Sequence, residues 1–195
     1  MTQESETREG ESNAPRDDAD RLVVITGGPG SGKSTLIAAL RAAGCATSDE
    51  AGRQIIKDQS AIGGRALPWV DPLLFAETML AHEMVAYRAM AGMGRRVFFD
   101  RGVPDVIGYL RVIGAPVPAH MRRAAEAFRY ARRVFIAPHW PEIFTRDAER
   151  KQSPGEAART CEAMRETYAE LGYSLVELPC APVTARVRFI LDAPG

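Results

Sequence analysis

The feature that most constrains this chain is a glycine-rich stretch, Gly27-Gly28-Pro29-Gly30-Ser31-Gly32-Lys33-Ser34-Thr35. Its spacing is a glycine, four free positions and then Gly-Lys-Ser/Thr, which is typical of phosphate-binding loops. The four glycines allow backbone N–H groups to turn toward the phosphates of a nucleotide. The pattern predicts that Lys33 reaches the outer phosphates and that the Ser34 hydroxyl ligates Mg²⁺. The alternative interpretation is a flexible glycine-rich turn.

The residues on either side of this stretch favour phosphate binding. Residues 21–26 form a short apolar run rich in β-branched side chains, which predicts a buried parallel strand. Residues 36–43 are good helix formers and stop at Gly44, a typical residue just past a helix end. Strand, loop and helix therefore follow in the order that nucleotide binding requires, and the helix N-terminus directs its partial positive charge at the phosphates.

The composition predicts a single domain without a membrane span. The chain has 195 residues, of which 46% are hydrophobic, and this is enough to bury one substantial core. Its 25 basic and 25 acidic residues balance, which gives no support for a general nucleic-acid binder. Three cysteines without metal-ligand spacing, and no apolar run of about 18 residues, predict a cytoplasmic protein.

Charge is distributed unevenly along the chain. Residues 1–20 hold seven acidic residues against two arginines, a net charge of −5, with no aromatic or large aliphatic side chain after Met1. Such a segment buries too little apolar surface to offset the entropy of ordering. We therefore expect a disordered acidic tail at residues 1–20 and one nucleotide-binding domain at residues 21–192. Since the whole chain is neutral, the remainder carries +5, which suits anionic substrates.

The rest of the chain alternates between strand and helix signals, which predicts an α/β fold with a parallel sheet. Residues 60–70 are predicted to form a loop, and the helix at 72–93 is predicted to be a buried core helix because apolar residues nearly surround it. Further strands are expected at 45–48, 95–100, 132–137 and 174–178, and further helices at 51–58, 103–112, 154–171 and 183–191.

Charged residues follow the second predicted strand, at the sheet edge where ligands of open α/β folds bind. For Asp49, helix capping and a functional role are both open. Glu50 and Arg53 are three residues apart and share a helix face, so we expect them to converge on one phosphoryl acceptor. Trp69, in the following loop, either stacks on a planar acceptor or packs against Pro68.

The third predicted strand ends in Asp100, followed by Arg101. A hydrophobic strand that ends in Asp after a phosphate loop predicts an acid that helps to hold Mg²⁺, and the alternative is that Asp100 caps the next helix. Many ATP-hydrolysing motors have a glutamate where this chain has Arg101, and a cation suits an anionic acceptor or the transferred phosphate instead. Arg146 and Arg150 lie four apart in a basic segment, so they either close over phosphates or form a solvated face.

Over residues 21–192 the chain resembles the P-loop kinase-like ATPases, an AAA-type ATP-binding family close to the nicotinamide riboside kinase domain and more distantly similar to nucleoside and nucleoside-monophosphate kinases. The resemblance rests on the loop Gly27–Thr35, on Asp49-Glu50-Ala51-Gly52-Arg53, on Asp100-Arg101 and on the Arg146/Arg150 segment. It implies a P-loop NTPase fold: a five-stranded parallel sheet with helices on both faces. It also implies ATP–Mg²⁺ at the loop, an acceptor site near Glu50, Arg53 and Arg101, and a short lid that carries Arg146 and Arg150.

These observations together predict a small-molecule kinase that transfers the γ-phosphoryl group of ATP to a nucleoside- or nucleotide-like acceptor. In this interpretation Lys33 and Mg²⁺ offset phosphate charge, and Glu50 or Asp100 takes the proton of the acceptor, a choice that the sequence leaves open. The rival interpretations are an ATPase switch or motor and a non-catalytic nucleotide-binding module. A GTPase is disfavoured because no Asn-Lys-x-Asp motif is present.

Overall fold

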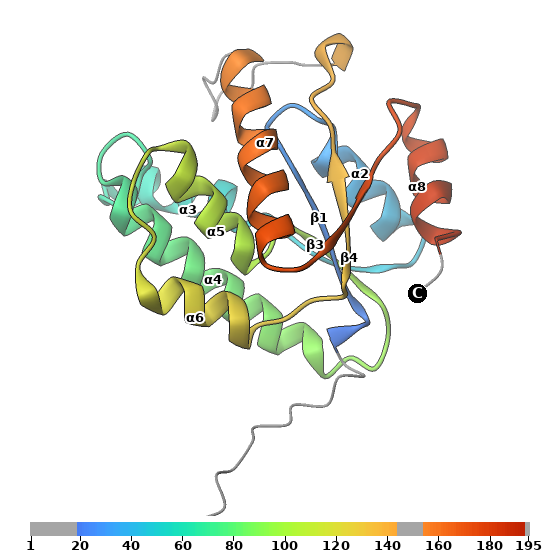
Figure 1. The fold of residues 1–195 in the computed structure, drawn as a ribbon, viewed down its shortest axis with the longest axis horizontal. Coiled ribbons are helices and arrows are strands. Elements are labelled where there is room, and N and C mark those ends of the chain that lie inside the picture. Colours follow the sequence, from blue (N-terminus) through green and yellow to red (C-terminus); the bar gives the residue numbers. More distant parts are fainter. Residues whose placement is uncertain (1–18, 144–153, 194–195) are drawn as a thin grey trace, which may run out of the picture.

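The computed structural model describes residues 19–143 and 154–193 of the chain (Figure 1). Within these residues, five strands form one sheet in the order β2-β3-β1-β4-β5, and every neighbouring pair is parallel. The strands are β1 (Leu22–Gly27), β2 (Ala46–Ser48), β3 (Val97–Asp100), β4 (Arg133–Ala137) and β5 (Ser174–Glu177). The predicted α/β fold with a five-stranded parallel sheet is confirmed.

Helices cover both faces of this sheet (Figure 1). One face carries α2 and α8, which contact each other, and the other carries α5, α6 and α7, with α4 packed on α5 and α3 packed on α4. The helices are α2 (Lys33–Ala42), α3 (Ala51–Ile62), α4 (Pro72–Ala91), α5 (Val103–Val112), α6 (Ala119–Ala127), α7 (Pro154–Glu170) and α8 (Val183–Leu191), and a 3₁₀ turn, η1, spans Pro141–Ile143.

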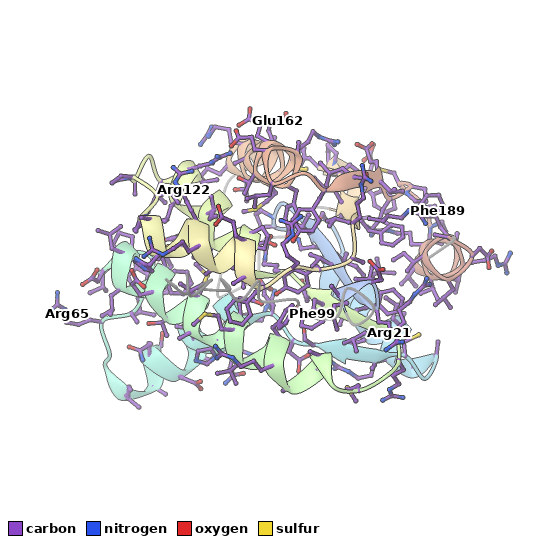
Figure 2. All side chains as sticks on the ribbon, turned by 60° about the horizontal axis from the view of Figure 1, so that its bottom comes forward. Arg21, Arg65, Phe99, Arg122, Glu162 and Phe189 are labelled. Carbon is purple, nitrogen blue, oxygen red and sulfur yellow. The ribbon has the colours of Figure 1, made fainter. Side chains whose placement is uncertain are left out.

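The core lies in two layers because alternate strand residues point to opposite faces. In β1, Leu22 and Val24 pack toward α5 and α7, whereas Val23 and Ile25 pack toward α2 and α8. Figure 2 shows Phe99 of β3 in the interior, whereas Arg65, Arg122 and Glu162 extend from the surface. The sheet is therefore buried on both sides, which explains the continuous apolar runs in its sequence.

The parallel register brings three chain segments to one edge of the sheet. β3 lies between β2 and β1, and Ile25 of β1 pairs with Asp100, the last residue of β3. Because parallel strands end at the same edge, the loop after β1, Glu50 after β2 and Arg101 after β3 emerge side by side. The fold therefore assembles the predicted candidate residues at a single place.

Two helix boundaries differ from the predicted ones by three residues or more. Helix α2 begins at Lys33 rather than Leu36, because the Leu36 N–H donates to the Gly32 carbonyl and completes a first turn there. Helix α3 continues past Asp58 to Ile62 and ends where Gly63 adopts a left-handed φ of 67°.

The predicted burial of the helix at 72–93 is wrong. Helix α4 buries one face, which contains Phe75, Ala76, Leu80 and Glu83, whereas Leu73 is 53% exposed and Val85 is 64% exposed. The reason is its position: it lies outside α5 and packs only inward. Among the described helices, none is long and apolar enough to cross a membrane.

Candidate functional site

The phosphate loop, which we define as Gly27–Thr35, is held tightly against its neighbours. A Cβ atom added to Gly27 would lie 2.3 Å from the Ala137 carbonyl oxygen of β4, and one added to Gly28 would lie 2.4 Å from the Ala157 carbonyl oxygen of α7. Gly30 has a left-handed φ of 71°. Glycine is therefore required by close backbone approach as well as by conformation, which excludes the interpretation as a merely flexible turn.

Lys33 reaches back over the loop that contains it. Its side chain is buried, and Nζ donates to the carbonyl oxygens of Gly27 at 3.0 Å and Gly28 at 2.6 Å and to Ser31 Oγ at 3.2 Å. Ser34, the next residue, is exposed at the start of α2. The lysine charge is therefore held inside the phosphate loop, and Ser34 is accessible at the start of α2.

The opposite side of the loop is held by a residue that sequence reasoning missed, Arg186 of α8. Its Nη1 donates to the Ser31 carbonyl oxygen at 3.0 Å and lies 2.8 Å from where a Gly32 Cβ would be. Arg186 is buried, and burial lowers the pKa of its guanidinium. Because the C=O and N–H groups of a trans peptide point in opposite directions, this bond turns the Gly32 N–H away from α8.

Asp100 ends β3 in a buried position. Its Oδ1 has no hydrogen-bond partner among the described residues. Burial raises the pKa of this carboxyl group, and the positive charges of Lys33 and Arg101 partly counter that effect. The alternative that Asp100 caps the next helix is wrong, because the Gly102 N–H donates to Asp105 Oδ2 instead.

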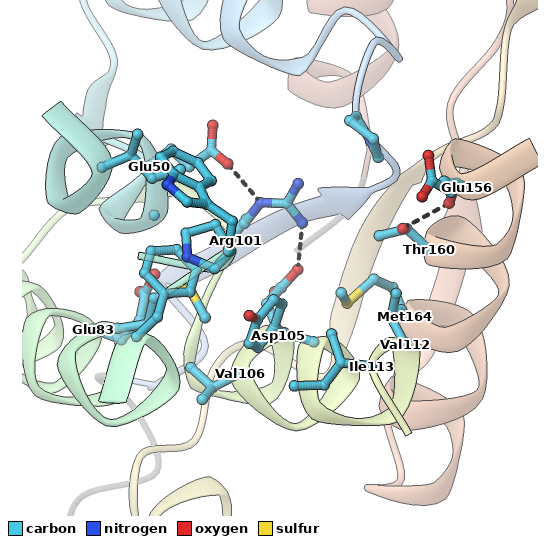
Figure 3. A pocket seen from close by; sticks show the side chains of 18 of the residues that line it. Glu50, Glu83, Arg101, Asp105, Val106, Val112, Ile113, Glu156, Thr160 and Met164 are labelled. Atoms are coloured by element: carbon cyan, nitrogen blue, oxygen red, sulfur yellow. Dashed lines mark hydrogen bonds and ion pairs between the residues drawn. The ribbon is translucent and has the colours of Figure 1, made fainter. Parts of the chain in front are cut away.

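Arg101 lies at the centre of the candidate site (Figure 3). Its Nε donates to Glu50 Oε1 at 3.0 Å, and its Nη1 donates to Asp105 Oδ1 at 3.0 Å and to the Gly27 carbonyl oxygen at 3.1 Å. It is also the one non-glycine residue with positive φ, 77°, in the described part of the chain. A left-handed conformation costs a non-glycine residue about 1–2 kcal/mol, so these contacts hold Arg101 against its own backbone preference.

Asp105, in the first turn of α5, is a second residue that sequence reasoning missed. Besides the Arg101 guanidinium and the Gly102 N–H, it accepts hydrogen bonds from the Thr26 hydroxyl and the Tyr168 hydroxyl, both at 2.6 Å. It thereby joins β1, α5 and α7 to Arg101. The sequence signal was an acid at the third helical position, which by itself indicates only a helix cap.

A cavity of about 950 Å³ adjoins the phosphate loop, with walls from α3, α4, α5 and α7 (Figure 3). Glu50 and Arg101 line it next to Pro29 of the loop. The apolar side chains of its walls are Ile56, Pro68, Trp69, Phe75, Met79, Val106, Tyr109, Val112, Ile113 and Met164. A pocket with mostly apolar walls and a few polar groups is typical of small-molecule sites.

Of the residues predicted to bind the acceptor, some line the cavity and others do not. Trp69 lines the cavity and is 61% exposed, so it is not a packed core residue. Arg53 lies beside Glu50, with Nε 3.8 Å from Oε2, and is outside the set of cavity-lining residues. Asp49 does not cap α3: its carboxylate accepts from Arg41 Nη2 at 2.6 Å on the surface, and Glu50 is the N-cap residue of the helix.

The cavity also contains residues that sequence reasoning did not select, among them Glu83 and Tyr109. Glu83 of α4 is buried, and its pKa lies well above the usual range, first because of burial and then because of the negative charge of Asp105. Burial also raises the pKa of Tyr109 to about 12. Arg159 and Thr160 of α7 line the wall that faces them. Arg146 and Arg150, the predicted lid arginines, lie outside the described residues.

Three solved structures are similar over most of the chain. NadR in complex with NR has a TM-score of 0.63 at 18% identity over 89% of this chain and 50% of that chain. Deoxyadenosine kinase from M. mycoides with dCMP and dCDP has a TM-score of 0.60 at 15% identity over 88% and 97%. Thymidylate kinase from Ehrlichia chaffeensis has a TM-score of 0.58 at 12% identity over 87% and 96%.

These likenesses show the fold, which is that of the P-loop kinases. The chain spans about half the length of the NadR chain that it matches. A comparison with curated proteins gave no match. A family model described as an AAA domain matches residues 22–186, most of the chain, and the protein therefore belongs to this AAA-domain family of P-loop proteins.

Proposed function

We propose that this protein is an ATP-dependent kinase that transfers the γ-phosphoryl group to a small nucleoside- or nucleotide-like acceptor. The observation that carries the proposal is that the phosphate loop and the cavity share a wall. Pro29 of the phosphate loop, Glu50 and Arg101 all line the cavity. A phosphate held by the loop therefore lies next to a space large enough for a nucleoside-sized molecule. The resemblance in fold to structures that contain NR or deoxynucleotides supports this class of acceptor.

On the nucleotide side, the loop N–H groups and Lys33 would hold the phosphates, and Ser34 and Asp100 would hold Mg²⁺. The buried Asp100 Oδ1 fits this role, because it has no hydrogen-bond donor within residues 19–143 and 154–193, and such a carboxylate oxygen is suited to a metal ion or to its bound water. Lys33 would exchange its loop carbonyls for phosphate oxygens. Bound Mg²⁺ would supply charge neutralisation at the β- and γ-phosphates.

On the acceptor side, the structure favours Glu50 over Asp100 as the general base. Glu50 lines the cavity, whereas Asp100 lies outside the set of lining residues. In the proposed reaction the acceptor hydroxyl gives its proton to Glu50, and its oxygen forms a bond to the γ-phosphorus. The bond from that phosphorus to the β–γ bridging oxygen breaks, and ADP leaves. Arg101 orients Glu50 through its Nε hydrogen bond.

The decisive experiment measures ADP formation by the full chain with ATP and Mg²⁺, alone and with nucleosides and nucleoside monophosphates. A kinase forms ADP in proportion to phosphorylated acceptor. ADP formation without any acceptor would indicate an ATPase switch, and tight ATP binding without turnover would indicate a non-catalytic module. Either result would overturn the proposal.

The role of Glu50 can be tested with two neighbouring substitutions. Glu50→Gln should lower the transfer rate about 10²–10⁴-fold, the usual contribution of a general base, and should leave the Kd of ATP unchanged. Asp49→Asn is the matched control, because Asp49 is exposed and bound to Arg41 away from the cavity. Transfer by Glu50→Gln at the rate of Asp49→Asn would rule out Glu50 as the base.

A further inference from the structure

Five arginines lie at the edge of the sheet opposite the phosphate loop. The neighbouring strands β3, β1 and β4 all start at this edge, and arginine stands at or just before the first residue of each. The backbone holds these starts together, because the Val97 N–H donates to the Arg21 carbonyl and the Ala131 N–H donates to the Leu22 carbonyl, both at 2.8 Å. We define the basic edge as Arg21, Arg95, Arg96, Arg132 and Arg133.

The basic edge keeps a positive charge when the acidic residues beside it are counted. Asp20 lines a small hollow at this edge, and Asp192 directly precedes Ala193, which lines the same hollow. Five positive charges and these two negative charges leave a net charge of +3. Arg95 and Arg132 are exposed, so the charge is presented to solvent. Such a surface attracts a partner of negative charge.

We propose that the basic edge binds the acidic segment of the same chain, residues 1–18, through charge attraction. Residues 1–18 hold six acidic residues against two arginines, a net charge of −4. The chain also enters the domain at this place, because Asp20 lines the hollow together with Arg96 and Arg133 of the basic edge. The segment and the edge are therefore opposite in charge and adjacent in the chain.

Covalent connection keeps the acids of the segment within reach of the basic edge. Asp17 and Asp18 precede Arg21 by four and three residues, and Glu11 precedes it by ten. A chain spans at most about 3.3–3.6 Å per residue, so Glu11 lies within about 35 Å of Arg21. A tether of this length gives an effective concentration in the millimolar range, at which ion pairs that are weak one by one can act together. This interaction requires no apolar surface, which the segment lacks.

A nucleic acid is the other polyanion that the same arginines could attract. The acidic segment is the favoured occupant because it is present beside the edge in every molecule, whereas a nucleic acid must bind from solution. The neutral charge of the whole chain also gives a nucleic acid no general attraction. Bound to the edge, the segment would compete with such a partner for the same arginines.

The test compares amide NMR spectra of the full chain at about 10 mM and about 1 M salt, where the Debye length is about 30 Å and about 3 Å. The amide signals of residues 4–11 should differ between the two salts, because only low salt keeps the segment at the edge. Arg95→Gln/Arg132→Gln should remove at least about half of this difference. Arg122→Gln/Arg123→Gln is the matched control, since it removes two exposed arginines of α6 and leaves the basic edge intact.

Figure 2 shows that the control lies apart from the basic edge, with Arg122 on one side of the molecule and Arg21 on the other. Both pairs of substitutions change the net charge of the chain by the same amount. Salt responses of residues 4–11 that are equal in the two double variants would overturn the proposal. A response that changes with protein concentration would also overturn it, because the segment would then bind a second copy.

The reciprocal variant neutralises the segment instead of the edge. Glu4→Gln/Glu6→Gln/Glu9→Gln/Glu11→Gln should shift the amide signal of Gly94, beside the edge, in the same direction as high salt does. A short DNA duplex is the probe for the rival partner, and it should bind this variant about tenfold more tightly than the parent, because the parent segment competes with it. Equal affinity of the duplex for both proteins would overturn the proposal.

Discussion

Lys33 has two roles at the scale of the single residue. In the structure its ammonium group bridges two carbonyls and one hydroxyl of its own loop, so it shapes the loop as well as supplying charge. The sequence interpretation assigned it only to the phosphates. A substitution must therefore keep the length of the side chain if it is to test phosphate binding alone.

Lys33→Met is the suitable change, because methionine keeps the apolar stem and removes the charge. We expect the Kd of ATP–Mg²⁺ to rise about 10–100-fold, the loss associated with one charge-assisted hydrogen bond of about 1.5–3 kcal/mol. The melting temperature should change by only a few degrees, since the loop lies at the edge of the sheet. Calorimetric titration together with a thermal melt checks both, and unchanged ATP affinity in a folded variant would contradict the assignment.

Glu83 predicts a pH dependence of stability whose sign follows from its raised pKa. The unfolded chain ionises this group near the ordinary value of 4.5, whereas the folded protein ionises it at a higher pH. Between these two values the unfolded state binds fewer protons, so the free energy of unfolding falls as pH rises. One such group contributes a slope of up to about 1.4 kcal/mol per pH unit.

Glu83→Gln removes this slope. Urea unfolding at pH 5, 6 and 7 should therefore show the variant gaining stability relative to the parent as pH rises. Glu77→Gln serves as the reference, because Glu77 is exposed on the same helix. A difference in the free energy of unfolding that stays constant from pH 5 to pH 7 would contradict the high pKa of Glu83.

At the scale of the element, local sequence patterns were sufficient wherever local forces decide the structure. The β-branched runs predicted the strands, and helix α4 begins at Pro72 as predicted, where Asp71 accepts from the Leu74 N–H. The pattern failed for the outer face of α4, because nothing local says whether apolar side chains such as Leu73 meet another layer. That face is exposed to solvent. Its exposure is determined by how the whole chain packs and not by the sequence of the helix itself.

The candidate site was predictable in part for the same reason. Glu50 and Asp100 follow strands, and the carboxyl ends of parallel strands must meet at one edge. Asp105 and Arg186 reach the site from α5 and α8, and their partners lie 79 and 155 residues away in the chain. Glu83 did leave a signal, since it continues the buried face of Ala76 and Leu80 at helical spacing. An acidic residue at a core position of the helix was therefore the sequence signal that Glu83 belongs to a site.

Arg186 connects α8 to the phosphate loop, and its effect on the proposed nucleotide binding can be tested separately from stability. Arg186→Met should raise the Kd of ATP–Mg²⁺ about tenfold or more, because the Ser31 carbonyl loses its donor and the Gly32 N–H loses its fixed direction. Arg188→Met, exposed on the same helix, is the matched control. The KM of the acceptor should be the same in both variants, and equal ATP affinities would show that Arg186 only fills space.

At the scale of the whole molecule, the two halves of the candidate site belong to different layers of the fold. The phosphate loop is held by β4, α7 and α8, whereas the cavity lies among α3, α4, α5 and α7. Helix α7 takes part in both, and its Tyr168 hydroxyl donates to Asp105, which in turn accepts from Arg101. The phosphate loop and the cavity, which are the proposed nucleotide and acceptor compartments, are therefore joined by one continuous hydrogen-bonded path.

The Gly27 carbonyl is the point where that path meets the loop, since it accepts from Lys33 at 3.0 Å and from Arg101 at 3.1 Å. If Lys33 turns to a nucleotide, Arg101 Nη1 remains as the donor to this oxygen, and the same guanidinium donates to Glu50 through Nε. The two substrates should therefore bind cooperatively. A non-hydrolysable ATP analogue should tighten acceptor binding several-fold, typical of coupling free energies of about 1–3 kcal/mol, and the acceptor must tighten analogue binding by the same factor. Titrations in both orders measure this coupling free energy. Independent binding of the two ligands would mean that the Gly27 carbonyl does not couple the two sites.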